Sequence, residues 1–156
     1  MLRDVRGGRI SKTESDQTLA ALRTLALLEP ALWLSFARAQ RHAGISQAQW
    51  EDSYKRAVEE SPDPAEILWE WSEAAAGADR QIKLKVQAVA ADPSNIALAS
   101  RAAMLLNGLY ATQRGLFASL TWRALLRQVA DALEEHFDEL DAPAVSRLAW
   151  TIHPRW

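Results

Sequence analysis

Apolar residues recur at helical spacing along almost the whole chain, and polar residues fill the positions between them. Apolar positions three and four residues apart place one stripe of side chains on a single face of a helix. No stretch shows the strict alternation that is typical of a strand. The pattern predicts helices at about residues 11–29, 31–43, 46–61, 64–76, 79–91, 95–107, 117–140 and 144–152. We therefore predict an all-α fold of seven or eight helices, with a longer helix near the C-terminus.

Glycines and prolines interrupt this pattern at regular intervals. Three glycines recur at spacings of 33 and 31 residues: Gly44, Gly77 and Gly108. Three prolines recur at spacings of 32 and 31 residues: Pro30, Pro62 and Pro93. Glycine adopts the left-handed helix cap at low cost, and the residue before a proline is pushed out of the helical region. Because a fixed period in this range is typical of helical repeats, we predict an antiparallel helix-hairpin solenoid.

The predicted repeats cover residues 13–114, between two segments of different character. Residues 1–12 carry four basic side chains and two adjacent glycines, which predicts a flexible basic arm. This arm could tether an anionic partner, or it could be a solvated terminus. In residues 115–156 the regular spacing of the helix breaks is lost. This change predicts capping helices of the kind that a repeat array needs at its end.

Composition narrows the possible classes of protein. The chain has 156 residues, a net charge of −2 and no cysteine. This charge does not favour nucleic acid or an anionic membrane, and disulfides and thiolate zinc sites are excluded. The longest apolar run, residues 25–34, is interrupted by Glu29 and Pro30 and is shorter than the ~20 residues of a membrane-spanning helix. The start lacks the apolar core of a signal peptide. We expect no membrane span, and a cytoplasmic location if this is the full chain.

Part of the chain resembles the tetratricopeptide repeat family and its half-a-tetratricopeptide relatives. The first helix of such a repeat has an aromatic, a large apolar and a small residue followed by a glycine, and the matching residues are Trp33, Phe36, Ala37 and Gly44. In the second helix, the aromatic, alanine and proline positions are matched by Tyr54, Ala57 and Pro62. The resemblance implies stacked antiparallel helix pairs with a concave groove that binds a peptide or a partner helix. In that family, the first helix of each pair lines the groove.

The neighbouring units depart from the family pattern. The second unit keeps three motif positions: Gly77, Ala88 and Pro93. However, Trp69 stands where the family has leucine, and Lys85 where it has an aromatic. The first unit also has one departure, because Trp50 stands where the family has a small residue. The third unit keeps only Gly108 and alanine-rich packing. The resemblance therefore covers residues 13–114, but only one unit matches the family pattern well. Other helical-hairpin repeats stay open as alternatives.

The chain contains seven tryptophans, and their positions relative to the apolar stripes differ. Trp33, Trp50 and Trp71 lie on the stripes, so we predict that they fill the core between helices. Trp69 lies off its stripe. We favour a position wedged between neighbouring hairpins, and the alternative is an exposed anchor for a partner.

Charged residues on the predicted first helices, at 31–43, 64–76 and 95–107, are the candidate contacts for a partner. With Trp69 added, the candidate binding residues are Arg38, Arg41, Trp69, Glu70 and Arg101. Arginine presents a planar fork to carboxylates, which suggests an acidic or C-terminal peptide as the ligand. The alternative is a solvated face whose ion pairs contribute roughly 0–1 kcal/mol each. The acidic segment at 134–141 could equally dock a basic partner.

No pattern in the sequence predicts catalysis. The three histidines, His42, His136 and His153, lack the matching ligand pair on a second helix that a helical metal site requires. There is no glycine-rich phosphate loop and no nucleophile elbow. We therefore expect no catalytic residue, no metal and no cofactor, and we predict that the chain is not an enzyme.

The function we predict is a non-catalytic protein–protein interaction module, an adaptor or a chaperone-like protein. The alternative is a helical-repeat protein of the RNA-processing type that binds nucleic acid. The net charge and the lack of a long basic stripe oppose that alternative. The dependence of binding on salt concentration distinguishes the two functions, because binding through phosphate contacts weakens steeply as salt rises. The identity of the partner and the oligomeric state stay open.

Overall fold

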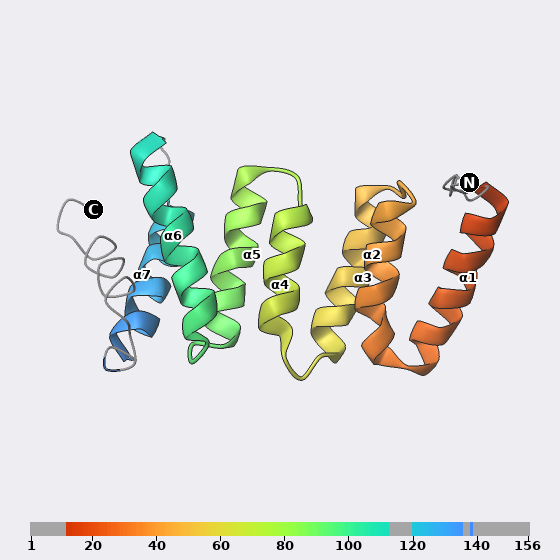
Figure 1. The fold of residues 1–156 in the computed structure, drawn as a ribbon, viewed down its shortest axis with the longest axis horizontal. Coiled ribbons are helices and arrows are strands. Elements are labelled where there is room, and N and C mark those ends of the chain that lie inside the picture. The colour runs from red at the N-terminus through yellow and green to blue at the C-terminus, as the bar shows by residue number, and fades with distance from the viewer. Residues whose placement is uncertain (1–11, 113–119, 136–137, 139–156) are drawn as a thin grey trace, which may run out of the picture. The chain divides into compact units, whose positions relative to one another are not determined.

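A computed structural model describes residues 12–112, 120–135 and 138 of the chain. Within these residues it contains seven α-helices, one short 3-10 helix and no strand (Figure 1). The elements are α1 (Lys12–Leu28), η1 (Pro30–Leu32), α2 (Trp33–His42), α3 (Gln47–Glu60), α4 (Pro64–Ala74), α5 (Ala78–Ala91), α6 (Ile96–Thr112) and α7 (Leu120–Glu135). The predicted all-α class is confirmed. None of the helices described is long and apolar enough to cross a membrane.

The chain divides into two compact units, Met1–Glu60 and Ser61–Trp156. The first contains α1, α2 and α3, and the second contains α4 to α7. The division falls next to Pro62, at one of the predicted breaks between helices. The predicted boundaries after residues 12 and 114 stay predictions, because residues 1–11 and 113–119 lie outside the described part of the chain.

In the first unit, α2 and α3 form an antiparallel hairpin whose turn contains Gly44. The φ of Gly44 is +70°, and its N–H and that of Ile45 donate to carbonyls in the last turn of α2. Such bonds satisfy carbonyls that would otherwise lack partners at the helix end. Trp50 and Tyr54 of α3 are buried with their ring centroids 5.9 Å apart in an edge-to-face contact. Trp33 is buried as well, so both predicted core tryptophans of this unit are confirmed.

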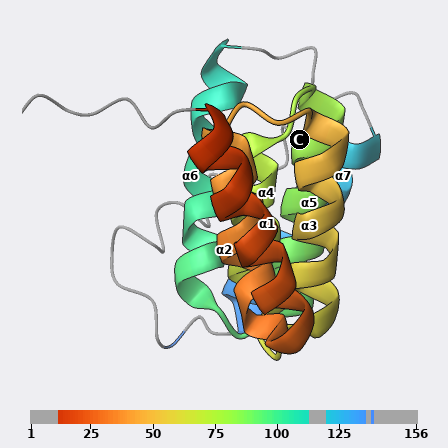
Figure 2. The same cartoon turned by 90° about the vertical axis from the view of Figure 1, so that its right-hand side faces the viewer.

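Helix α1 lies against α2 and η1, and Ala26 is its only fully buried residue (Figure 2). Leu25 and Leu28 are among the apolar residues at helical spacing in the predicted helix at 11–29, but both are exposed, and so is Leu27. The spacing therefore predicted the helix correctly, but of its apolar residues only Ala26 is buried, and Leu25 and Leu28 are exposed. The physical reason is that, within the described part of this unit, α1 has neighbours on one side only.

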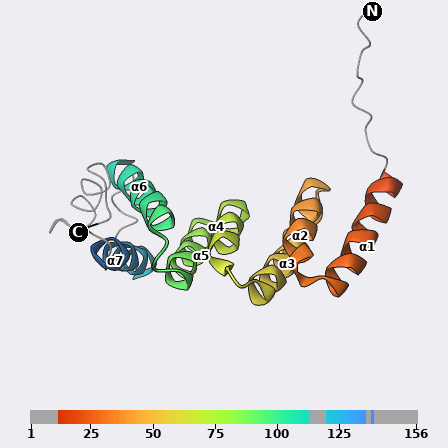
Figure 3. The same ribbon diagram turned by 60° about the horizontal axis from the view of Figure 1, so that its bottom comes forward.

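In the second unit, α4 and α5 form a hairpin whose turn contains Gly77, with a φ of +90°. Figure 3 shows α4 beside α5 and α6 beside α7. Helix α7 packs against both α5 and α6. Trp71 is buried in this unit together with Leu68, Ile82 and Val89, so the third predicted core tryptophan is confirmed.

The start of α4 agrees with the prediction, and the end of α6 does not. Helix α4 begins at Pro64 as expected, but the side chain of Asp63 makes no capping hydrogen bond. Instead, the Oγ of Ser61 accepts a 3.1 Å hydrogen bond from the N–H of Asp63. Helix α6 continues through Gly108 to Thr112, so Gly108 does not end it. A glycine inside a helix costs only about 1 kcal/mol relative to alanine, which the packing of neighbouring residues can offset.

The C-terminal predictions are only partly covered by the described residues. Helix α7 spans Leu120–Glu135, inside the predicted helix at 117–140. The ends of that prediction, the final helix at 144–152, most of the acidic segment at 134–141 and the basic arm at 1–11 lie outside the described residues.

Candidate binding surfaces

A groove of about 500 Å³ runs between α1 and α3 in the first unit. Helices α1 and α3 run in the same direction, because each is antiparallel to α2 (Figure 1). Leu19, Ala20 and Arg23 form the wall on α1. The wall on α3 includes Ala48, Asp52 and Arg56. We call this hollow the α1–α3 groove.

The floor of the α1–α3 groove combines aromatic and polar side chains. Trp33 and Phe36 of α2 are buried, with ring centroids 5.8 Å apart and an angle of 66° between the rings. Beside them, the hydroxyl of Ser53 donates a 2.7 Å hydrogen bond to Oε1 of Gln40 and joins α3 to α2. Because these side chains are held by burial and by this hydrogen bond, the floor is a preformed surface.

The charges along the α1–α3 groove are unevenly compensated. The guanidinium of Arg56 lies over Trp33, 4.8 Å from the ring centroid, and its Nε is 3.5 Å from Oδ2 of Asp52. Arg23 is exposed on the opposite wall and makes no ion pair or hydrogen bond within the described part of the chain. Two cations therefore face one carboxylate, and the groove carries an excess of positive charge.

A second hollow, of about 790 Å³, lies where the first turns of α1 approach the C-terminal end of α2. Its lining includes Lys12, Asp16, His42 and Ile45, and Leu19 borders both hollows. The N-terminal half of α1 therefore has open space on both sides of Leu19.

The two predicted binding residues of the first unit lie outside both hollows. Arg38 is exposed on α2. Nη1 of Arg41 donates a 3.0 Å hydrogen bond to the hydroxyl of Tyr54, and the guanidinium lies 5.8 Å from the ring centroid of Trp50. Arg41 thus joins α2 to α3 within the hairpin, and its donors are partly used by this contact.

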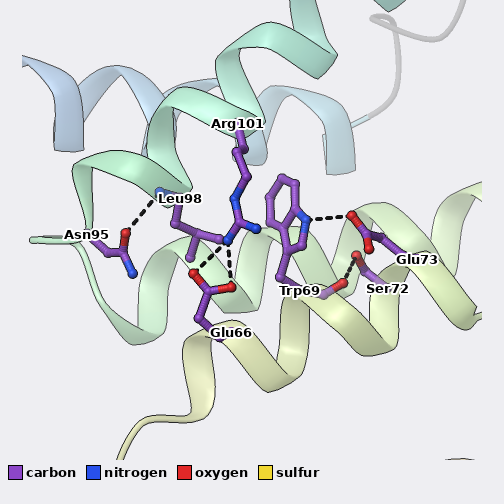
Figure 4. A network of polar contacts seen from close by, with 7 residues as sticks. All are labelled: Glu66, Trp69, Ser72, Glu73, Asn95, Leu98 and Arg101. Carbon is purple, nitrogen blue, oxygen red and sulfur yellow. Dashed lines mark hydrogen bonds and ion pairs between the residues drawn. The ribbon is translucent and has the colours of Figure 1, made fainter. Parts of the chain in front are cut away.

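In the second unit, Trp69 is buried, with 5% of its surface exposed. The side chains of Lys85 and Arg101 lie over its ring, 4.9 and 5.1 Å from the centroid. The indole Nε1 donates a 2.8 Å hydrogen bond to Oε1 of Glu73 (Figure 4). These contacts match the wedged position that we favoured. A partner could reach little of the indole in this arrangement, so Trp69 does not provide an exposed anchor.

Arg101 and Glu66 connect α6 to α4 above the indole of Trp69 (Figure 4). Nη2 of Arg101 lies 2.6 Å from both carboxylate oxygens of Glu66. Their side chains are 45% and 50% exposed, respectively. Glu70 is partly exposed on α4 and has a partner of its own. The structure therefore brings two predicted residues, Trp69 and Arg101, together, but Arg101 is already engaged by a carboxylate of its own chain.

Lys85 of α5 is 5% exposed, and its Nζ donates a 2.6 Å hydrogen bond to Oγ of Ser72. The Ser72 hydroxyl in turn donates to the carbonyl of Trp69 at 2.5 Å. Burial lowers the pKa of the Lys85 amine, and the nearby Glu73 carboxylate partly opposes that shift. Because the proton of the Ser72 hydroxyl is used within the helix, this pair has the arrangement of a structural contact rather than of an activated nucleophile.

The described residues contain no group of three or more histidine, cysteine or acidic side chains that could hold a metal ion. His42 is exposed at the end of α2. His136 and His153 lie outside the described residues.

Sequence reasoning missed the residues of the α1–α3 groove, Arg23 and Arg56 above all. The sequence does contain a pattern that places three of these residues together, since Ala48, Asp52 and Arg56 follow one another at four-residue spacing on one face of α3. It was not decisive, because the same spacing is common on solvated helix faces. Only the position of α1 beside α3 turns these residues into one wall of a groove.

Comparisons of the chain with protein-family models, curated proteins and solved structures give no match. The resemblance to tetratricopeptide repeats therefore stays a prediction, and the function is argued from the geometry.

Proposed function

We propose that this chain is a non-catalytic protein-interaction module, an adaptor or chaperone-like protein, that binds a peptide or helix of a partner. The observation that carries the proposal is the α1–α3 groove, which is open to solvent, walled by two helices that run in the same direction and floored by a third. A groove of this form suits the recognition mode in which a helix lies along a hollow between helices. Its exposed alanines, Ala20 and Ala48, leave room for a partner backbone.

The hairpins support a repeat of the tetratricopeptide type. Gly44 and Gly77 both adopt positive φ values in the turn between two paired helices. A polar contact between residues thirteen positions apart joins the helices of each hairpin, Arg41 to Tyr54 in one and Ser72 to Lys85 in the other. Repeats of this type commonly serve as binding scaffolds, because stacked units present an extended surface.

The charged residues predicted on the first helices stay second candidates for partner binding, each within its own unit. They are Arg38 and Arg41 in the first unit and Glu70 and Arg101 in the second. An acidic ligand at Arg101 would have to compete with Glu66, which lies 2.6 Å from its Nη2. For this reason we place the primary site in the α1–α3 groove, where Arg23 has no such competitor among the described residues.

A displayed peptide library selected on the immobilised full chain tests this function. A selected peptide is then labelled, and its affinity is measured by fluorescence anisotropy for the wild type and for Ala20→Trp, which fills the groove. We expect Ala20→Trp to weaken binding at least about tenfold, since a bulky side chain would occupy the space of the ligand. Ala21→Trp is the matched control, because Ala21 is exposed on the same helix and does not line the groove.

Two results would overturn the proposal. In one, the library yields no peptide that binds the chain reproducibly. In the other, a selected peptide binds Ala20→Trp as tightly as it binds the wild type and Ala21→Trp, which would place its site elsewhere.

A further inference from the structure

We propose that the α1–α3 groove selects an acidic amphipathic helix, with a carboxylate between Arg23 and Arg56 and an apolar side chain beside Leu27. This inference rests on the proposed function and names the class of partner for the same groove.

Arg23 provides a positive charge that no group within the described residues compensates. It is exposed on the wall of α1 and has no ion pair or hydrogen bond within the described residues. A guanidinium offers several donors in a planar fork and retains its charge at every physiological pH. A carboxylate is the side-chain group of a protein partner that fits this geometry best, through charge-assisted hydrogen bonds.

Arg56 provides a second positive charge on the opposite wall, and two contacts hold its guanidinium in place. Its guanidinium is held 4.8 Å from the ring centroid of Trp33 and 3.5 Å from Asp52. Contacts on two sides limit the rotamers of the side chain before any ligand arrives, which lowers the entropic cost of binding. A single carboxylate, that of Asp52, cannot balance both arginines, so an acidic ligand gains from the groove and a basic ligand is repelled.

The order of residues along the walls defines the ligand further. On α1, Ala20, Arg23 and Leu27 lie on one face at successive turns, and Leu27 is 61% exposed. Ala48, Asp52 and Arg56 follow in the same direction on α3. On both walls an exposed alanine therefore lies one turn before the charges, and Leu27 follows Arg23 on the same face of α1, just beyond the residues that line the groove. A helix with small, acidic and apolar residues at successive turns complements this order.

The test uses designed helical peptides of about 15 residues, long enough to fold on binding. One peptide carries glutamate at the position facing Arg23, and its partners carry glutamine or lysine there. The glutamate peptide should bind the full chain about tenfold or more tightly than the lysine peptide at low salt, and the difference should shrink as salt rises. Arg23→Glu should reverse this preference, so that the lysine peptide binds more tightly.

Arg127→Glu is the matched charge control, since Arg127 is exposed on α7 in the second unit. Circular dichroism and thermal melting show whether Arg23→Glu folds, and Arg23→Gln, which should abolish the preference without reversing it, provides a second variant. The inference is overturned if glutamate, glutamine and lysine peptides bind equally, or if a single-stranded RNA of mixed sequence competes as well as the glutamate peptide does. Equal binding of all three peptides that is lost in Ala20→Trp would still leave the proposed function intact. If none of these peptides and no peptide from the library binds, the proposed function fails as well.

Discussion

The ammonium of Lys85 lies over the buried indole of Trp69, with Nζ 4.9 Å from the ring centroid. The pair joins α5 to α4, and Ser72 completes it by accepting a 2.6 Å hydrogen bond from the same Nζ. A charged amine with 5% of its residue exposed loses most of its hydration, and one hydroxyl and one aromatic ring replace it incompletely. The contact therefore holds a charge in the hairpin at an energetic cost, and that cost depends on pH.

The contribution of Lys85 to the stability of the chain should become more favourable as pH rises in the alkaline range. Burial lowers the pKa of its amine in the folded state below the ordinary value of 10.5. Between the lowered pKa and 10.5, the unfolded state binds more protons than the folded state, so the free energy of unfolding increases with pH. The gain is complete above 10.5 and absent below the lowered pKa. Urea denaturation at a series of pH values measures this slope.

Lys85→Met is the control for this pH dependence, because methionine keeps an unbranched apolar stem and cannot titrate. Other groups also titrate in this range, so the quantity to compare is the difference in unfolding free energy between wild type and variant. That difference should shift in favour of the wild type as pH rises. A difference that stays constant with pH would mean that the Lys85 amine keeps its ordinary pKa in the folded chain.

The pair formed by Arg101 and Glu66 should contribute little to stability despite its short distances. Both side chains are about half exposed, and exposed ion pairs are typically worth about 0.2–1 kcal/mol. Glu66→Gln should lower the free energy of unfolding by that amount at most. Arg101→Met should cost about 1–2 kcal/mol, because it also removes the cation over the ring of Trp69.

A double-mutant cycle separates the two contributions of Arg101. The coupling between Glu66→Gln and Arg101→Met reports the ion pair, and the remaining loss in Arg101→Met reports the contact with Trp69. Equal losses in the two single variants would show that the contact with the ring contributes nothing. Glu59→Gln, at the exposed pair of Lys55 with Glu59, is a suitable reference for an ordinary surface ion pair.

Turns that depend on the chemistry of a single residue could be predicted from the sequence. The burial of a side chain, which depends on the helices packed around it, could not. The turns at Gly44 and Gly77 follow from the cost of a positive φ, which is a property of single residues. By contrast, the leucines of α1 have the spacing of a buried stripe, yet Leu25 and Leu28 are exposed because α1 packs on one side only. Helical spacing shows which side chains share a face, and it does not show what covers that face.

The candidate sites illustrate the same limit. The sequence placed Trp69 off the apolar stripe, and the structure explains this position by the cations that meet it from two other helices, Lys85 on α5 and Arg101 on α6. Lys85 was noted only as a departure from a family pattern. Arg23 and Arg56 share a groove although they lie 33 positions apart in the chain, and no local pattern connects them.

Gly44→Ala should destabilise the chain by about 1–2 kcal/mol, the cost of placing an L-residue in the left-handed region. No atom other than those of Gly44 and its two chain neighbours lies within 4 Å of the position that the new Cβ would occupy, so backbone strain and not a steric clash causes the loss. Gly44→Asn should lose less, since asparagine tolerates positive φ better than alanine. Urea denaturation of the two variants measures the difference. Equal stability of Gly44→Ala and the wild type would indicate that the turn can adopt another conformation without cost.

Trp50→Ala should lower the free energy of unfolding by about 3–5 kcal/mol, the range for truncating a large buried aromatic side chain. Trp50 is 7% exposed and packs edge-to-face on Tyr54, which is itself fully buried. Truncation would leave a cavity beside Tyr54 and would remove the ring beneath Arg41. Leu28→Ala, at a side chain 78% exposed, is the control and should change stability by less than about 0.5 kcal/mol. If urea denaturation gives a loss below about 1 kcal/mol for Trp50→Ala, the hairpin of α2 and α3 does not depend on this side chain.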